Sequence, residues 1–306
     1  MTDIKELIEK LNQEYWLVYV EEISKKLKPK IQKNGVLKLI REKVDEDYKE
    51  RINSLHSEFI SDKSIINLDD QVKNLTDEIL KINNIKNNSI YYEFFKHLKH
   101  IENRNNEFDE LILIANLIDD TNINISTKMK LNNIVSKIIN QSINQSNKSN
   151  AGAAGETITE SILKKIGFSE GTQYKKQFKS SEGSDTDFVY PYVDDFDDIN
   201  VQIFMAVQFS TNDRARLTSS ELKTGGEKIA LTYNDFPSST KKLKDIGDQI
   251  VGDYKKERVR IVAYSEGIKK EIIRCEKYSK FERAEYFQNY ASSFEEYFGQ
   301  LKNRFS

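Results

Sequence analysis

The 306-residue chain has little of several features that define common protein classes. Its one cysteine, Cys275, has no partner within the chain, which excludes an internal disulfide and a zinc–thiolate cluster. The three histidines offer few imidazole ligands for a metal. No apolar run approaches the roughly 20 residues that span a bilayer, and the first residues lack the apolar core of a secretion signal. We therefore expect a cytoplasmic protein with no membrane partner.

An excess of charge of one sign is also missing. Lys+Arg number 47 and Asp+Glu number 49, so the formal net charge is −2. This balance neither requires nor forbids a nucleic-acid partner. Asparagine, isoleucine and lysine are frequent, which is typical of an AT-rich genome and favours a bacterial source.

Glycine and proline are scarce in residues 1–148, where only Gly35 and Pro29 occur. Apolar residues recur there at spacings of three and four, which predicts one helix after another. The first such set is Ile4, Leu7, Ile8 and Leu11. The pattern predicts a helical domain over residues 1–148.

The composition changes after a polar tract at residues 140–150, which we interpret as a linker or a fraying helix end. The following residues predict a helix ending at Gly167, further helices over 243–254 and 269–305, and strands over 172–178, 184–190, 200–210, 229–232 and 259–264. This order predicts an α+β fold, in which the helical N-terminal domain precedes a mixed-sheet domain over residues 149–306, flanked by helices.

The residues with the clearest chemical meaning are Asp187 on one expected strand and Gln208 on the next. Alternate residues of a strand face the same side, so positions 206 and 208 point into one site. The carbonyl of Val207 is a further oxygen ligand. Hard oxygen donors of this kind suit Mg²⁺, which keeps several waters and needs only one or two carboxylates beside a substrate phosphate.

The segment Gly183-Ser184-Asp185-Thr186-Asp187-Phe188, followed by Ala206-Val207-Gln208-Phe209-Ser210, resembles the active site of type II restriction endonucleases of the PD-(D/E)XK superfamily, in particular BglII and its relatives. The resemblance covers about residues 183–232. It implies a PD-(D/E)XK nuclease core that hydrolyses double-stranded DNA with Mg²⁺ at a specific sequence, within a restriction-modification system. It places Asp187 and Val207 at the metal and Gln208 beside the reacting water.

Two departures from the family pattern concern the metal site. The strand glutamate of the family falls on Ala206, and the separation between Asp187 and Gln208 is longer, with an acidic insert at residues 194–198. Three explanations for Ala206 stay open: an engineered inactivating substitution, a natural protein that binds without cutting, or an acid that has migrated. Glu156, near the start of an expected helix, is the candidate for the migrated acid.

The resemblance also implies how DNA is read and how the chain assembles. Arg suits guanine edges, Asn suits adenine, and Ser or Thr serves either base. Cutting both strands of a palindromic site pairs two active sites, which implies a C₂ homodimer. The helical domain over residues 1–148 is then expected to serve dimerisation or DNA recognition. The residues expected to contact DNA are Ser210, Thr211, Asn212, Arg214 and Arg216.

Other interpretations of the same residues remain. A lone strand aspartate is most often a turn or cap residue, and a glutamate such as Glu156 is more often a first-turn helix acid than a catalytic one. The chain as a whole is alternatively a catalytically inactive DNA-binding or phage-defence module with a nuclease fold, or a helical interaction subunit with a degenerate nuclease tail. DNA cleavage and DNA binding by the chain and by its Ala206→Glu variant distinguish these functions.

Overall fold

The computed structural model describes residues 3–13, 15–32, 36–98, 108–179, 185–191, 202–208, 226–233 and 247–305. By packing, the chain divides into two compact units. Unit 1 comprises Met1–Asn53 and Leu80–Ser149, and unit 2 comprises Ser54–Ile79 and Asn150–Ser306. Three long helices, α3 (Val36–Ser61), α4 (Leu68–Leu98) and α6 (Ile125–Lys165), contribute residues to both units.

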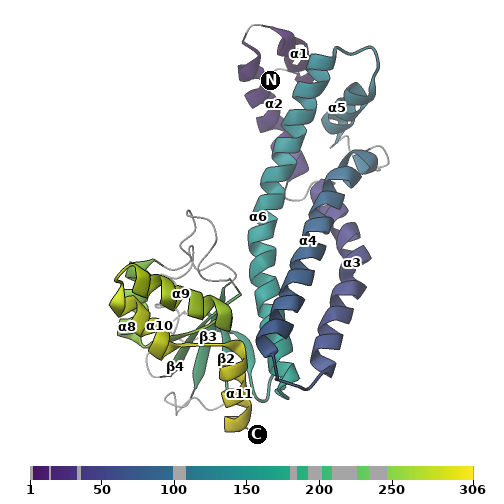
Figure 1. The fold of residues 1–306 in the computed structure, drawn as a ribbon. Helices are drawn as coiled ribbons and strands as arrows, with labels where there is room; N and C mark the ends of the chain where they lie inside the picture. Colours follow the sequence, from purple (N-terminus) through teal and green to yellow (C-terminus); the bar gives the residue numbers. More distant parts are fainter. Residues whose placement is uncertain are drawn as a thin grey trace. The chain divides into compact units, whose positions relative to one another are not determined.

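Unit 1 is helical in its described residues, as the apolar periodicity predicts (Figure 1). Besides its parts of α3, α4 and α6 it contains α1 (Ile4–Glu9), a 3₁₀ turn (Lys10–Asn12), α2 (Trp16–Ile31) and α5 (Asp109–Asp119). One buried apolar cluster draws on all of these helices, and its fully buried members include Leu11, Ile23, Leu27, Ile31, Val36, Phe94, Leu131 and Ile139. Each helix thus buries the apolar stripe that its sequence carries.

Unit 2 is built on one six-stranded mixed sheet, which confirms the expected mixed architecture. The strands lie in chain order: β1 (Lys175–Lys179), β2 (Asp185–Tyr190), β3 (Ile203–Gln208), β4 (Glu227–Thr232), β5 (Val259–Val262) and β6 (Ala291–Ser292). The pairs β1–β2 and β2–β3 are antiparallel, and the pairs from β3 to β6 are parallel. β3 is buried along its whole length, as expected for a central strand covered on both faces.

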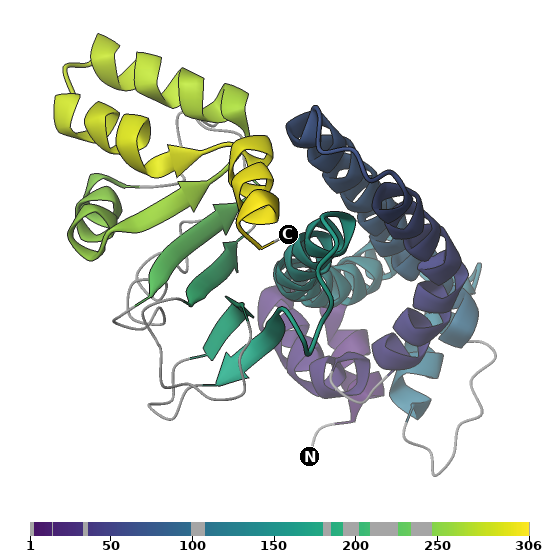
Figure 2. The same ribbon diagram turned by 90° about the horizontal axis from the view of Figure 1, so that it is seen from below.

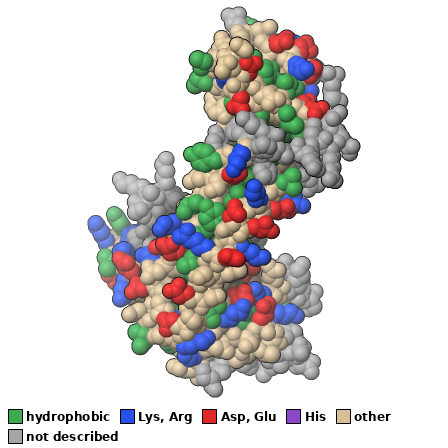
Figure 3. All heavy atoms as spheres, turned by 90° about the vertical axis from the view of Figure 1, so that its right-hand side faces the viewer, with side chains coloured by type: hydrophobic (Ala, Val, Ile, Leu, Met, Phe, Trp, Pro, Cys, Tyr) green, Lys and Arg blue, Asp and Glu red, His purple; other side chains and the backbone are tan. Residues whose placement is uncertain are grey.

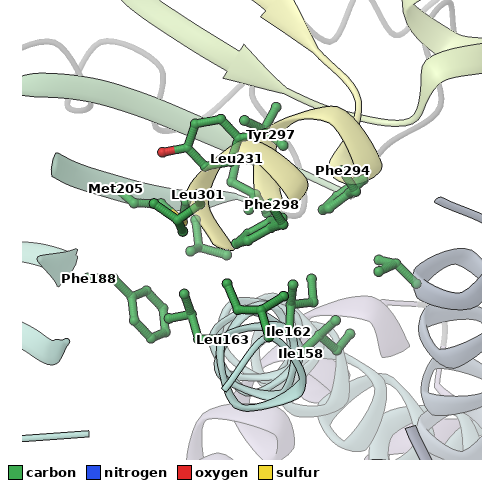
Figure 4. Packing of buried hydrophobic residues seen from close by; sticks show 14 of the residues in the cluster. Ile158, Ile162, Leu163, Phe188, Met205, Leu231, Phe294, Tyr297, Phe298 and Leu301 are labelled. Carbon is green, nitrogen blue, oxygen red and sulfur yellow. The ribbon is translucent and has the colours of Figure 1, made fainter. Parts of the chain in front are cut away.

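Helices cover both faces of this sheet (Figures 1 and 2). Phe188, Met205 and Leu231 point to one face, where they pack against α6 and α11 (Phe294–Phe305), as the labelled side chains of Figure 4 show. Val189 and Phe204 point to the other face, toward α8 (Asp248–Glu257), α9 (Ser265–Lys277) and α10 (Phe281–Tyr290). Alternation along the strands therefore divides the interior into two apolar layers.

The polar tract at residues 140–150 is helical, so its interpretation as a linker is wrong. It lies inside α6, which runs without a break across the boundary between the units. The tract contains no glycine or proline, and the helix-forming stretches on both sides extend through it. Asparagine, glutamine and serine have only weak preferences against the helix, and the buried Ile143 helps to anchor this turn.

The division into units also differs from one boundary at residue 148, because residues 54–79 pack with the C-terminal half. The side chain of Asp69 provides a local reason. Its two carboxylate oxygens accept hydrogen bonds from the backbone N–H of Ser265 at 3.0 Å and of Glu295 at 3.2 Å, at the N-terminal ends of α9 and α11. A carboxylate there satisfies helix N–H groups and complements both helix dipoles.

The tail expected to be helical over residues 269–305 contains α9, α10 and α11, but the two-residue strand β6 interrupts it. No helix among the described residues is long and apolar enough to cross a membrane. On the face drawn in Figure 3, the described Lys and Arg side chains are interspersed with Asp and Glu. That face therefore carries no extended field of one sign among the residues described, in line with the balanced composition.

Candidate active site

Asp187 lies in β2, and its side chain reaches the neighbouring strand. The antiparallel register between β2 and β3 runs from Tyr190 opposite Ile203 to Phe188 opposite Met205, and its continuation places Asp187 opposite Ala206. There the Asp187 Oδ2 accepts a hydrogen bond of 2.7 Å from the backbone N–H of Val207. A side-chain carboxylate thus bonds the β3 backbone beside residues 206 and 208.

Ala206 and Gln208 share a face of the sheet with Asp187. Ala206 packs in the apolar layer that contains Val189, and Val207 packs in the opposite layer with Phe188. Because side chains alternate along a strand, Asp187 belongs with Val189, and Gln208 belongs with Ala206. By this alternation positions 187, 206 and 208 lie on one face of the sheet, and their meeting in one site stays a prediction.

The two β3 residues are both buried, with Ala206 4% exposed and Gln208 5% exposed. Ala206 lies beside Ala230 of β4 in the parallel register, and Gln208 lies beside Thr232. The main-chain carbonyl of Gln208 accepts a hydrogen bond of 3.3 Å from Tyr233 N–H, which holds the end of β3 against β4. The amide of Gln208 is consequently presented from a fixed strand end rather than from a loop.

The backbone of Val207 also faces this site. In an extended strand the N–H and the C=O of one residue point to the same flank, which is why paired residues exchange two hydrogen bonds. The Val207 N–H points to β2, where it donates to Asp187. The Val207 carbonyl is therefore directed to the same flank as the Asp187 carboxylate.

Glu156 is half-buried on α6, well inside the helix and not near its start. The interpretation of Glu156 as a first-turn acid is wrong, because α6 begins at Ile125. The Glu156 Oε2 accepts a hydrogen bond of 3.3 Å from the Gln177 side-chain amide. In the β1–β2 register, Lys176 lies opposite Phe188 and Phe178 opposite Thr186, so Gln177 falls opposite Asp187. Glu156 therefore reaches the strand next to the one that carries Asp187.

Sequence reasoning did not identify Gln177, whose backbone has φ = +47° within β1. A residue other than glycine rarely adopts this left-handed conformation, and such residues are found at functional sites more often than elsewhere. A second feature missed is Glu160, one turn after Glu156, which forms ion pairs with Lys164 and Lys176. Burial opposes ionisation of Glu160, but the hydrogen bonds from the two lysines outweigh it and lower its pKa. The sequence did contain a signal for Glu160: it follows Glu156 by four residues, a spacing that places both acids on one face of a helix.

The residues expected to read DNA lie outside the part of the chain that the structure describes: Ser210, Thr211, Asn212, Arg214 and Arg216. The acidic insert at residues 194–198 lies outside it as well. The basic stretch at residues 255–258 is described, and within it Lys255 forms an ion pair of 3.0 Å with Glu285. Glu285 therefore offsets part of the charge of Lys255.

The described residues contain no group of three or more His, Cys, Asp or Glu side chains that could hold a metal ion. At the candidate site the oxygen donors are the Asp187 carboxylate, the Val207 carbonyl and the Gln208 amide, and Ala206 adds none. A carboxylate with neutral oxygens still has the chemistry that Mg²⁺ prefers, provided that a phosphate completes the shell. The donor set fits a weakly held Mg²⁺ and lacks the second acid of a tight site.

Comparisons with known proteins leave the family open. No family model matches the chain, and no curated protein matches it. Among solved structures, the chain is similar to metal-depleted Ecl18kI in complex with uncleaved, modified DNA, with 15% sequence identity and a TM-score of 0.41. The match covers 99% of this chain and 86% of that chain. A likeness of this size carries no argument for fold or function, so the geometry of Asp187, Ala206 and Gln208 stands by itself.

Proposed function

We propose that the chain is a Mg²⁺-dependent endonuclease of the restriction type, which hydrolyses phosphodiester bonds of double-stranded DNA at a specific sequence. The observation that carries this proposal is the 2.7 Å hydrogen bond from Val207 N–H to the Asp187 carboxylate. It brings together the two halves of the motif, which are 20 residues apart in the sequence. The mixed sheet and the shared face of positions 187, 206 and 208 support the same proposal.

The chain's own residues have distinct roles in this proposal. Asp187 holds the cation, and the hydrogen bond from Val207 fixes the direction of its carboxylate. The Val207 carbonyl and the Gln208 amide oxygen add neutral ligands. Gln208 can donate and accept hydrogen bonds, so it orients a water molecule, but it supplies no positive charge at the phosphate. Bound Mg²⁺ lowers the pKa of a coordinated water and offsets charge on the phosphate.

Double-stranded DNA is the proposed partner, and two copies of the chain form the C₂ homodimer that a palindromic site requires. Ser210, Thr211, Asn212, Arg214 and Arg216 follow β3 directly and are the proposed contacts to DNA. The bacterial cytoplasm is the proposed location.

A second candidate function is favoured by Ala206. A buried methyl group stands where the second acid is expected, which is the state of a module that binds DNA without cutting it. Glu156 is the proposed replacement acid if the unaltered chain does cut. Its hydrogen bond with Gln177 of β1, the strand next to β2, supports this role, although α6 packs on the face of the sheet opposite to Ala206.

Cleavage of a supercoiled plasmid with Mg²⁺ tests these functions. We expect the Ala206→Glu variant to cut the plasmid, with Ala206→Gln as the uncharged control of matched size. Adding Asp187→Asn to Ala206→Glu is expected to lower the cleavage rate at least about 100-fold relative to Ala206→Glu alone. Cutting by the unaltered chain that Glu156→Gln abolishes assigns the acid to Glu156. DNA binding in gel-shift assays without any cutting supports the binding module, and the absence of both overturns the nuclease proposal.

A further inference from the structure

A groove of about 720 Å³ runs between α2 and α6 within unit 1. Three hydrogen bonds join the two helices, which run parallel to each other. The Asn12 side-chain amide donates to Thr127 Oγ1 at 2.8 Å, Lys130 Nζ donates to the Leu11 carbonyl at 2.7 Å, and Gln32 Nε2 donates to the Ile138 carbonyl at 3.5 Å. The groove therefore lies between two helices held together near each end of α2.

The floor of the groove is apolar. On α2 the side chains of Ile23 and Leu27 are buried in the core, whereas Val20 is only half-buried and lines the groove. Leu17 also lines it and is 66% exposed. On α6 the groove is lined by Ile134 and Ile138, each only 3% exposed, so Leu17 and Val20 offer more of the apolar surface that a ligand can reach. The lining residues recur every three to four positions from Trp16 to Lys28, which spans about 18 Å or three helical turns.

The rim of the groove is basic. Four lysines line it, Lys25, Lys28, Lys130 and Lys137, against one acid, Glu21. Lys25 forms an ion pair with Glu21 at 3.1 Å, and the Lys130 ammonium lies 4.5 Å from the centre of the Trp16 ring. Among the residues that the structure describes, Lys28 and Lys137 form no ion pair, so one cation on each wall lacks an internal acidic partner.

We propose that this groove docks an amphipathic helix of about three to four turns, supplied by a partner protein, whose apolar face is flanked by aspartate and glutamate. Its apolar side chains cover Leu17 and Val20, and its acids pair with Lys28 and Lys137. A DNA backbone also attracts lysines, but it offers nothing to an apolar floor, and this favours the acidic helix. The proposal is independent of the nuclease activity.

Trp16 makes the test direct, because it is the only tryptophan of the chain and it lines the groove. The probe is a synthetic 16-residue helix with leucines on one face and glutamates beside them, added to the full chain. A matched peptide with lysines in place of the glutamates, and a scrambled peptide of the same composition, are the controls. We expect the acidic helix to shift Trp16 emission to shorter wavelength, with little change from either control.

The variants locate the binding. Lys28→Glu with Lys137→Glu is expected to weaken the acidic helix by at least about tenfold, because two attractive pairs become repulsive. The milder Lys28→Gln with Lys137→Gln is expected to show the same trend, and circular dichroism checks that each variant is folded. Lys38→Glu with Lys49→Glu, on exposed α3 positions of the same unit, is the matched control and is expected to change affinity less than about twofold.

Failure of the acidic helix to bind overturns the proposal. Binding of a 20-base-pair DNA duplex instead, with the same dependence on Lys28 and Lys137, overturns it in favour of a nucleic-acid site. Equal affinity of the lysine peptide overturns it as well, because the basic rim then has no part in recognition.

Discussion

The interiors of the two units differ in chemistry. In unit 1 the buried polar side chains among the described residues are Thr127 and Ser142. Unit 2 buries a much larger set: Thr76, Thr159, Ser161, Lys165, Thr186, Gln202, Gln208, Lys228, Thr232, Glu271, Arg283 and Ser293. Burying a polar group is unfavourable unless it is hydrogen-bonded, so unit 2 depends on specific partners where unit 1 depends on apolar contact.

The buried polar groups of unit 2 join segments that are distant in the sequence. Tyr190 and Tyr297 hydroxyls lie 2.6 Å apart, and the Thr159 and Tyr233 hydroxyls lie 2.7 Å apart. Burial raises the pKa of both Tyr190 and Tyr297 well above the ordinary value, so both hydroxyls stay protonated at neutral pH. The unit with the candidate site is thus also the one whose packing is specified by polar pairs, and single substitutions test this difference between the two units.

The largest effect is expected from Glu271→Ala. Glu271 and Arg283 are 2% and 7% exposed, and their side chains are joined at 2.8 Å. Removing the acid leaves the buried guanidinium of Arg283 without this partner, which costs about 3–5 kcal/mol in the free energy of unfolding of unit 2. Amide hydrogen exchange of β3 and β4 measures this loss, and Glu266→Ala, in an exposed pair with Lys270, is the matched control.

The same variant tests whether the two interiors are separate. Trp16 belongs to unit 1, so its fluorescence in a urea titration reports that unit alone. We expect the Trp16 transition of Glu271→Ala to match that of the unaltered chain. If Glu271→Ala lowers the stability of unit 1, measured by Trp16 fluorescence, as much as that of unit 2, measured by hydrogen exchange, the two units unfold together. That result contradicts the difference between the two interiors.

The next largest effect is expected from Lys165→Met. The fully buried Lys165 ammonium donates to the carbonyls of Phe59, at 3.0 Å, and of Asp62, where α3 ends. A cation at the C-terminal end of a helix satisfies its last carbonyls. Methionine keeps the apolar stem and removes these bonds, so we expect a loss of about 2–3 kcal/mol by hydrogen exchange. Lys164→Met, at a neighbouring exposed lysine, is expected to change much less, and equal losses count against the role of the buried charge.

A smaller effect is expected from Asp69→Ala. This substitution removes the acceptor for Ser265 N–H and Glu295 N–H, and a lost cap costs about 1–2 kcal/mol. The neighbouring Asp70 is exposed, so Asp70→Ala is the matched control. Hydrogen exchange in the first turns of α9 and α11 checks the result. If Asp70→Ala has the same effect, the two caps are not the reason that residues 54–79 pack with unit 2.

The smallest effect is a dependence on pH through His56. The pKa of His56 is lowered, mainly because burial disfavours its charged form. The nearby Glu160 opposes this shift without cancelling it, and Lys164 lowers the pKa further. The folded state therefore binds the proton more weakly than the unfolded state, so stability is complete above the unfolded pKa of about 6.5 and falls as the pH drops below it. We expect urea titrations from about pH 8 to pH 5.5 to show a smaller fall for His56→Gln than for the unaltered chain. Identical slopes would falsify this assignment.

Much of the secondary structure could be predicted from the sequence, because apolar residues are strongly periodic. β3 was expected from its run of apolar residues, and the six residues from Ile203 to Gln208 are all buried. The helices of unit 1 follow their stripes for the same reason. The polar tract within α6 could not be predicted, since its helical state depends on the helices that flank it.

The pairing of Asp187 with the strand of Gln208 was also expected from the motif. The role of residues 54–79 in unit 2 was not, because the bonds of Asp69 connect positions 196 and 226 residues apart in the sequence. The position of Glu156 within a long helix and its contact with Gln177 depend likewise on tertiary packing. Sequence patterns report local periodicity, whereas these features arise from contacts between distant segments.

The most direct test of the central claim is Mn²⁺ binding, followed by electron paramagnetic resonance. The measurement compares the unaltered chain, Ala206→Glu, and Ala206→Glu with Asp187→Asn. If positions 187, 206 and 208 form one cation site, Ala206→Glu binds Mn²⁺ at least about tenfold more tightly than the unaltered chain, and the added Asp187→Asn removes the gain. Equal Mn²⁺ affinity in all three chains contradicts the claim, because the Asp187 carboxylate and residue 206 would then not share a ligand.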